Sequence, residues 1–190
     1  MRFFYSLGKV NNEYPKRREE KVHLFLETKR LQARAMTQED AQWLINERNK
    51  FFQENHLIKT TEWPGNGLLA LLPFYTEALE AKELEAGFGP WYLIEKPIRK
   101  VIGNVNLKSA DKGEQVEIGY TIVPSARGKG FAQEAVAAVS DWVFTRKVAV
   151  ITAQCDQSNL PSLRVLKNTG FKIYGREDTI LFFKKVRNSR

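Results

Sequence analysis

The sequence predicts one compact α/β domain of the α+β kind, and three observations support this. Hydrophobic residues make up 43% of the 190 residues, which is enough for a single sizeable core. Between residues 91 and 123, short β-rich runs separated by turn residues indicate an antiparallel meander. From residue 131 onwards the hydrophobic spacing becomes helical and alternates with strands. The expected order is a strand, two helices, three strands, a helix, a strand, a helix and two strands.

The N-terminal segment differs in composition from the rest of the chain. Residues 1–22 are polar and of mixed charge, and they end in a run of Lys, Arg and Glu. We expect them to form an exposed extension, followed by one domain over residues 23–190. The first strand is expected over residues 24–31, where leucines and a phenylalanine gather.

Capping signals and turn residues define the helices that precede the meander. Thr37 can cap a helix and Asp40, three places on, can reciprocate, so a helix is expected to begin there. Residues 57–67 contain Pro and Gly and are expected to form a loop. Residues 68–86 resume a helical pattern, which Gly87 is expected to end. The first helix is expected to bury Ala41, Leu44 and Ile45.

The meander and the elements after it are expected at definite positions. Strands are expected over residues 91–94, 101–107, 116–123, 148–153, 171–174 and 179–186, and helices over 131–145 and 159–168. Four aromatic side chains near these strands could line an acceptor pocket, although such residues are more often part of the core. They are Trp63, Phe88, Trp91 and Tyr92.

Composition narrows the classes of partner. A net charge of +8 favours polyanions, such as nucleic acid or a coenzyme with several phosphates. The basic residues are spread without a basic–aromatic repeat, so nucleic acid is the less favoured. The cysteine content and the hydrophobic runs indicate the compartment. The single cysteine, Cys155, excludes an intrachain disulfide, which is typical of a protein in a reducing cytoplasm. No apolar run is long enough for a secretory signal or a membrane span, so a cytoplasmic protein is expected. No spacing of Asp, Glu, His or Cys suggests a metal site.

A glycine-rich turn carries the chain from the last meander strand into a helix. Free amides at a helix start point outward with the positive end of the helix dipole, and glycines let a phosphate approach the backbone. The Arg-Gly-Lys-Gly turn at residues 127–130 therefore predicts a site for a phosphorylated ligand. It is not a Walker A loop, because Gly130 follows Lys129 where Ser or Thr is needed. It is not a Rossmann fingerprint, because Gln133 stands where the third glycine belongs.

The turn resembles the acetyl-CoA signature of the GNAT superfamily of N-acetyltransferases, which reads Gln/Arg-x-x-Gly-x-Gly/Ala. Further matches span roughly residues 24–186, in the order and spacing of the branch that contains the N-terminal acetyltransferases of ribosomal proteins. The matching segments are Arg127-x-x-Gly130-x-Ala132, Thr28-x-Arg30-Leu31-x-x-Arg34 with Asp40-Ala41, Glu117-Ile118-Gly119-Tyr120, Asn159-x-x-Ser162 and Leu166-Lys167-Asn168-Thr169-Gly170-Phe171.

The resemblance implies the GNAT fold, a mixed and mostly antiparallel twisted sheet that is splayed between strands 4 and 5 and flanked by about four helices. Acetyl-CoA would lie in that opening as co-substrate, with no metal. Backbone groups of Ile122 and Val123 would meet the pantetheine arm and thioester, and Asn159 would contact the arm from the other side. The amides that would hold the pyrophosphate are those of Arg127, Gly128, Lys129, Gly130, Phe131 and Ala132.

The same resemblance suggests two catalytic residues. Glu117 is the candidate base, at a position where we expect burial, unless it pairs with a basic neighbour and only shapes the site. Ser162 stands where the ribosomal-protein branch has a serine near the coenzyme sulfur, so it could donate to the departing thiolate or simply pack in its helix. Many members use a tyrosine on this helix, but Leu166 occupies that place. Glu134 is expected to be a structural ion-pair or capping residue, and Cys155 a small, buried side chain.

The resemblance implies direct transfer of an acetyl group from acetyl-CoA to a primary amine. The acceptor is expected to be a small molecule or a protein N-terminus, and the enzyme a monomer or homodimer. A second hypothesis is a catalytically idle acyl-CoA sensor that keeps the fold and the cofactor site. A third, less favoured, is a basic nucleic-acid-binding domain, whose binding would depend steeply on salt.

Overall fold

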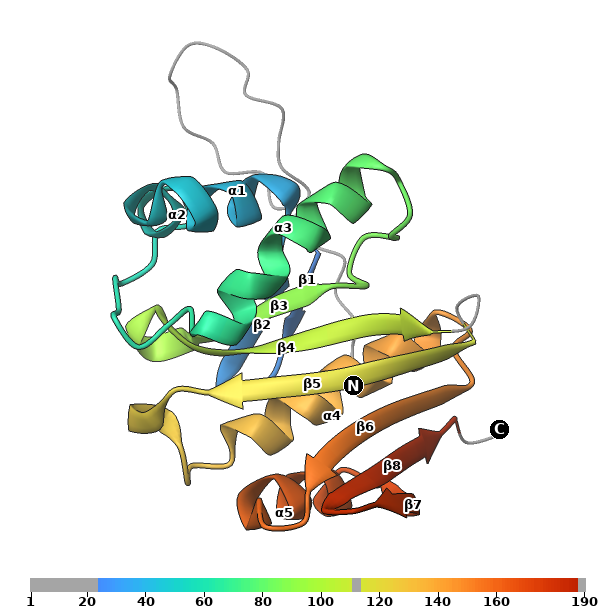
Figure 1. Cartoon of the computed structure of the whole chain (residues 1–190). Coiled ribbons are helices and arrows are strands. Elements are labelled where there is room, and N and C mark those ends of the chain that lie inside the picture. Colours follow the sequence, from blue (N-terminus) through green and yellow to red (C-terminus); the bar gives the residue numbers. More distant parts are fainter. Residues whose placement is uncertain (1–23, 111–113, 188–190) are drawn as a thin grey trace.

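The computed structural model describes residues 24–110 and 114–187 (Figure 1). The predicted extension over residues 1–22 lies outside the described residues, and the single domain over 23–190 stays a prediction. An eight-stranded sheet forms the centre, in the order β1-β2-β3-β4-β5-β6-β8-β7, with every neighbouring pair antiparallel except β5 and β6. The strands are β1 Phe25–Glu27, β2 Leu31–Ala35, β3 Pro90–Glu95, β4 Lys100–Ala110, β5 Gln115–Ile122, β6 Val150–Asp156, β7 Lys172–Glu177 and β8 Ile180–Val186.

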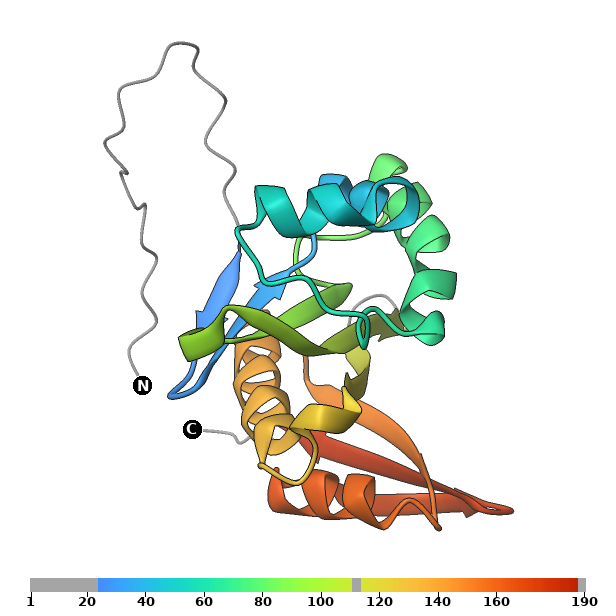
Figure 2. The same cartoon turned by 90° about the vertical axis from the view of Figure 1, so that its left-hand side faces the viewer.

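Helices cover both faces of the sheet. Trp91 and Tyr92 are neighbours on β3 and therefore point to opposite faces. The Trp91 ring packs on Trp142 of α4 (Phe131–Thr145), with 5.0 Å between centroids, whereas the Tyr92 ring packs on Phe51 of α2 (Arg48–Glu54) at 5.2 Å. Helix α4 thus lies on one face and helices α1 to α3 gather over the other (Figure 2). In the described residues the helices are α1 Gln38–Asn46, α2 Arg48–Glu54, α3 Asn66–Glu80, α4 Phe131–Thr145 and α5 Leu160–Asn168.

The meander, the aromatic core and the first helix cap are confirmed. Strands β3, β4 and β5 pair antiparallel in sequence order. The Thr37 side chain accepts from the Asp40 amide at 3.0 Å, and the Asp40 carboxylate accepts from the Thr37 amide at 3.1 Å. The aromatic residues that could have lined a pocket are buried in the core instead, namely Trp63, Phe88, Trp91 and Tyr92.

Local backbone geometry overturns several expectations in the first half of the chain. The strand expected over residues 24–31 is a hairpin, because the Thr28 hydroxyl accepts from the Leu31 amide at 2.9 Å and closes a turn between β1 and β2. Ile45 is 42% exposed rather than buried. Helix α2 was not expected, so the described residues contain five α-helices rather than about four.

Helix α3, which lies on the face of the sheet opposite α4, also ends earlier than the sequence suggests. Helix α3 stops at Glu80, because Lys82 turns the backbone into the left-handed region at φ +57°. Gly87, at φ +91°, lies in the turn that leads to β3 and does not cap α3. The sequence pattern could not separate the two turns, since apolar residues continue at helical spacing between them.

The parallel pair of β5 and β6 is short, and this opens the sheet. Pairing is confined to Gln115–Glu117 on β5 and Val150–Thr152 on β6. Beyond it, β5 continues along β4 while β6 pairs with β8, and the two strands diverge in Figure 1. This is the predicted splay between strands 4 and 5. It falls between β5 and β6 because the first expected strand is a hairpin.

Two negative findings concern the described residues only. None of the helices in residues 24–110 and 114–187 has the length and apolar character needed to cross a membrane. The same residues contain no group of three or more His, Cys, Asp or Glu side chains placed to hold a metal ion.

Candidate active site

The turn between β5 and α4 presents a row of unpaired amides. A short 3-10 turn over Pro124–Ala126 ends the strand, and Gly128 and Gly130 then adopt φ values of +74° and +80°. Such left-handed conformations favour glycine, and Gly130 is also the N-cap of α4. Within the described part of the chain, the N–H groups of residues 128–133 donate to no protein acceptor. The start of α4 therefore offers free donors and the positive end of its dipole to an anion.

Arg127 supports this cradle and does not contribute its amide to it. The Arg127 N–H donates to the Pro124 carbonyl at 3.2 Å, and its Nε donates back to the Ile122 carbonyl at 3.0 Å. The prediction that the Arg127 amide holds pyrophosphate is therefore corrected, since that amide closes the 3-10 turn. The free amides begin one residue later, at Gly128.

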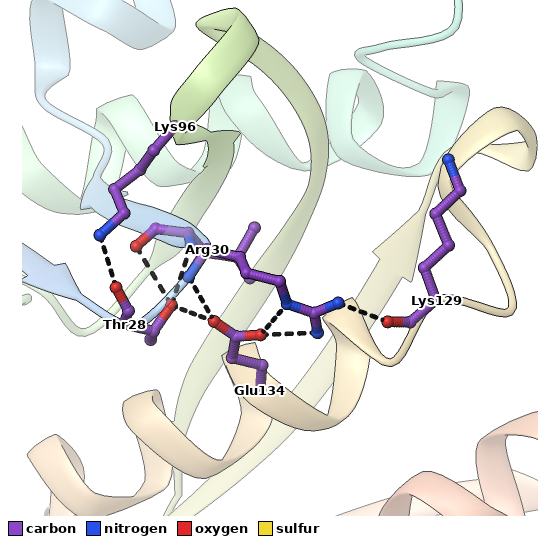
Figure 3. Close-up of polar contacts among 6 residues, drawn as sticks. Thr28, Arg30, Lys96, Lys129 and Glu134 are labelled. Carbon is purple, nitrogen blue, oxygen red and sulfur yellow. Dashed lines mark hydrogen bonds and ion pairs between the residues drawn. The ribbon is translucent and has the colours of Figure 1, made fainter.

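The other predicted cradle residues contribute in different ways. The Phe131 side chain is buried beneath the Arg30 guanidinium, 4.4 Å from the ring centroid, so only its backbone faces outward. Ala132 is half-buried at the first turn of α4. The Lys129 ammonium has no hydrogen bond or ion pair with any described residue, and Figure 3 shows it extending away from the Lys129 carbonyl. Lys129 and the exposed guanidinium of Arg127, of which only Nε bonds to a described residue, are the two cations of the turn.

Glu134 fixes the cradle to the turn between β1 and β2. Its carboxylate accepts from the Thr28 hydroxyl at 2.5 Å, from the Arg30 amide at 2.9 Å and from Arg30 Nε at 2.7 Å, and it pairs with Arg30 Nη2 at 2.7 Å. Arg30 Nη1 donates in turn to the Lys129 carbonyl at 2.8 Å (Figure 3). Burial disfavours the charge, but these donors outweigh it and hold the pKa of Glu134 below its ordinary value. The expected structural role of Glu134 is confirmed by these contacts.

The open edge of β5 exposes the backbone groups of alternate residues. The Val123 amide donates to a β4 carbonyl at 2.9 Å and the Val123 carbonyl accepts from a 3-10 amide at 3.0 Å. The Val123 amide is therefore not free for the pantetheine arm, and a contact with the arm could be made only through the second lone pair of the Val123 carbonyl. Because antiparallel residues alternate in direction, Tyr120 and Ile122 face the opening. The Ile122 carbonyl is taken by Arg127, which leaves the Ile122 amide and both groups of Tyr120.

Glu117 lies at the narrow end of the opening, where β5 still pairs with β6. Its carboxylate accepts from Gln154 Nε2 at 3.3 Å, and it forms no ion pair with any described residue. Glu117 is only half-buried, so the expected burial is incomplete. Gly119 lies two residues further along β5, and a side chain at this position would have open space, because an added Cβ would meet nothing within 4 Å. The sheet face beside Glu117 is therefore open, although helices α1 to α3 lie on this side.

Ser162 lies across the opening from β5, in the first turn of α5. Asn159 caps this helix, because its side-chain oxygen accepts from the Ser162 amide at 3.2 Å. The Asn159 side-chain amide donates to no described residue. Leu166 is buried in the core, and Cys155 is buried with its thiol 3.4 Å from the Asp156 carbonyl, as expected.

Tyr120 is a residue of this site that the sequence analysis missed. Its hydroxyl lies 2.7 Å from Ser162 Oγ and 3.1 Å from the Ser162 carbonyl oxygen. Burial raises the pKa of Tyr120, and the hydrogen bond with Ser162 offsets only part of that effect. The only sequence signal was strand alternation, which turns Tyr120 and Ile122 to the same side of β5.

A depression of about 360 Å³ adjoins the cradle on its α5 side. Gly130 and Gln133 at the start of α4 line one side, and Asn168 at the end of α5 lines the other. Two residues of the row of free amides, Gly130 and Gln133, therefore border a surface hollow.

Comparisons with known proteins identify a family for this chain and a fold that it shares. The acetyltransferase (GNAT) domain family matches residues 30–172. The uncharacterized N-acetyltransferase YjdG of Bacillus subtilis is 31% identical over 112 residues, which are 58% of this chain and 67% of that protein. Among solved structures, the ribosomal-protein-S5-alanine acetyltransferase from Vibrio fischeri aligns with a TM-score of 0.61 and 19% identity, over 86% of this chain and 96% of that one.

A second structure adds a ligand to the comparison. The microcin C7 self-immunity acetyltransferase MccE, solved in complex with acetyl-CoA and AMP, aligns with a TM-score of 0.57 and 15% identity, over 84% of this chain and 94% of that one. At these identities the two structures establish the shared fold. The family match is stronger, because residues 30–172 include β5, the glycine turn, Glu134 and Ser162. The chain therefore belongs to the acetyltransferase (GNAT) domain family and is an acyltransferase.

Proposed function

We propose that this enzyme transfers an acetyl group from acetyl-CoA to a primary amine by direct attack within a ternary complex. The observation that carries the proposal is the row of free amides at residues 128–133, set at the mouth of the opening between β5 and β6. Acetyl-CoA is the acetyl donor of this family, and the site suits it. Two left-handed glycines leave the backbone bare for a pyrophosphate, and the Lys129 ammonium adds a positive charge.

The opening of the sheet suits the arm of the coenzyme. The Ile122 amide and the backbone groups of Tyr120 can pair with amide groups of pantetheine, as a neighbouring strand would. From the other side, the Asn159 side chain can donate to the same arm. A backbone donor beside the thioester oxygen stabilises the negative charge that develops there when an amine attacks.

Glu117 is placed to act on the acceptor. An amine is protonated at neutral pH, so the reaction needs a base, either direct or through water. Glu117 is the carboxylate nearest the end of the β5–β6 pairing, and the space above Gly119 gives an acceptor room beside it. We therefore assign Glu117 as the base, with a small-molecule amine or a protein N-terminus entering above Gly119.

Turnover tests the proposal directly. Purified protein with acetyl-CoA should release free thiol when given a suitable primary amine, and mass spectrometry should find that amine acetylated on nitrogen. The panel includes small amines and a peptide that begins with alanine, because the Vibrio fischeri neighbour is named as a ribosomal-protein-S5-alanine acetyltransferase. Binding of acetyl-CoA without turnover would favour the sensor. Failure to bind acetyl-CoA, with salt-dependent binding of nucleic acid, would favour the third hypothesis.

A matched pair of variants serves as the control for that assay. Glu117→Gln keeps the shape of the side chain but removes the base, so kcat should fall by about 100-fold with unchanged acetyl-CoA affinity. Gln154→Ala removes only the hydrogen bond to Glu117 and should lower kcat far less. Equal rates for wild type and Glu117→Gln would show that another group accepts the proton.

A further inference from the structure

Two hydroxyl groups meet across the opening of the sheet, one from β5 and one from α5. Tyr120 and Ser162 are 42 positions apart, yet their oxygens lie 2.7 Å from one another, and both side chains are half-buried. Leu166 on the same helix is buried in the core and carries no polar group. Strand β5 therefore supplies, through Tyr120, a phenol hydroxyl at the first turn of α5.

The pair has two hydroxyl protons, and their arrangement decides what Ser162 can donate. In one arrangement the phenol donates to the Ser162 carbonyl, 3.1 Å away, and the serine hydroxyl donates to the phenol oxygen. In the other, the phenol donates to Ser162 Oγ and leaves the serine proton free to turn elsewhere. A negative charge in the opening favours the second arrangement, because an ionised acceptor makes the stronger hydrogen bond. The change needs only the rotation of two hydroxyl groups.

The surroundings of Ser162 favour a negative charge as well. Ser162 lies in the first turn of α5, where the capped helix presents the positive end of its dipole. Burial raises the pKa of Tyr120, so the phenol keeps its proton at neutral pH and remains a donor. The titratable group whose charge acts on Tyr120 is the Cys155 thiol, which is buried and donates to the Asp156 carbonyl.

We propose that Tyr120 is a positioning residue for Ser162, whose hydroxyl it holds so that the serine proton faces the sulfur of the departing coenzyme. The inference rests on the proposed acetyl transfer. In that reaction the amine nitrogen bonds to the acetyl carbon, the carbon–sulfur bond breaks, and sulfur leaves with the electron pair. The proton from the amine passes to Glu117 or water. The thiolate accepts a hydrogen bond from Ser162 and takes its proton from solvent, while Tyr120 stays protonated throughout.

The decisive test uses free coenzyme A and needs no turnover. The ultraviolet absorbance of the thiolate is followed against pH for bound coenzyme A, with coenzyme-free protein as the blank. In wild type the thiol pKa should lie below that of free coenzyme A, and Tyr120→Phe and Ser162→Ala should each raise it by about one unit. The double variant should raise it no further than Ser162→Ala, because Tyr120 acts through Ser162. An unchanged thiol pKa in Tyr120→Phe, or additive shifts, would overturn the proposal.

Kinetics provide an independent readout that a purely structural role would not produce. Tyr120→Phe should lower kcat by about tenfold and leave the KM for acetyl-CoA unchanged. The matched control is Tyr174→Phe, which removes a hydroxyl from a side chain that is 52% exposed on β7 and should change neither constant. A raised KM with unchanged kcat would mean that Tyr120 only shapes the coenzyme site, and would overturn the proposal.

The two experiments also separate this proposal from the proposed function. If wild type fails to bind coenzyme A, the cofactor assignment fails and the positioning role fails with it. If coenzyme A binds but no amine is acetylated, the acceptor chemistry fails, whereas the thiol titration still decides whether Tyr120 acts through Ser162. Melting temperatures of wild type and the four variants, measured alongside, show whether each variant is folded.

Discussion

Replacing Gly130 with valine is expected to weaken acetyl-CoA binding by about 1,000-fold, which corresponds to about 4 kcal/mol. Gly130 sits at φ +80°, where a β-branched residue is strained by about 1–3 kcal/mol, so the turn would relax away from its present geometry. The amides of residues 128–133 would then no longer point together at one anion, and each hydrogen bond lost to a phosphate weakens binding by about 1.5–3 kcal/mol. Isothermal titration of acetyl-CoA into the variant measures the effect.

The matched control for this variant is Gly67→Val. Gly67 lies in the first turn of α3, has no positive φ, and has nothing within 4 Å of an added Cβ. It should therefore bind acetyl-CoA as wild type does. If Gly130→Val, with an unchanged melting temperature, bound acetyl-CoA normally, the cradle would not be the phosphate site.

Replacing Glu134 with alanine is expected to lower the free energy of unfolding by about 2 kcal/mol, because the partly exposed Arg30 and the hydroxyl of Thr28 lose their shared acceptor. Acetyl-CoA should also bind more weakly, since Arg30 would no longer be held against the Lys129 carbonyl. Denaturant unfolding and titration calorimetry measure the two effects. Glu77→Ala, on an exposed position of α3, is the control and should change neither.

The contribution of Glu134 should also depend on pH in a definite direction. Hydrogen bonds and the Arg30 charge lower the pKa of Glu134 in the folded protein despite partial burial, so folding favours its ionised form. The stability gained is fully present above the pKa of an unfolded glutamate, about 4.3, and is lost as the pH falls through the folded pKa. The difference in unfolding free energy between wild type and Glu134→Gln should therefore shrink on acidification. A difference that stays constant or grows as the pH falls would contradict this assignment.

The features that could be predicted from the sequence depend on residues close together in the chain. The phosphate turn follows from glycines directly before a helical pattern, and the first helix cap follows from Thr37 and Asp40. Alternating and helical spacing placed the meander and α4 within a few residues. Errors arose where a single backbone angle decides the outcome. Lys82 ends α3 by adopting a left-handed conformation, which could not be predicted because lysine rarely does so.

The parts of the site that could not be predicted depend on contacts between distant segments. The sequence does not reveal that the Val123 amide donates to β4 and that its carbonyl accepts a hydrogen bond from the 3-10 turn. Tyr120 reaches Ser162 only because β5 and β6 diverge and α5 closes the gap. The structural role of Glu134 was expected, but its partners were not. They lie on the β1–β2 turn, 104 and 106 positions away, and sequence spacing could not identify them.

A crystal structure of the protein with acetyl-CoA tests the central claim most directly. The account predicts pyrophosphate density against the amides of residues 128–133, the pantetheine arm between β5 and β6, and the thioester sulfur beside Ser162. Phosphates bound elsewhere on the basic surface, with the opening between β5 and β6 left empty, would contradict it.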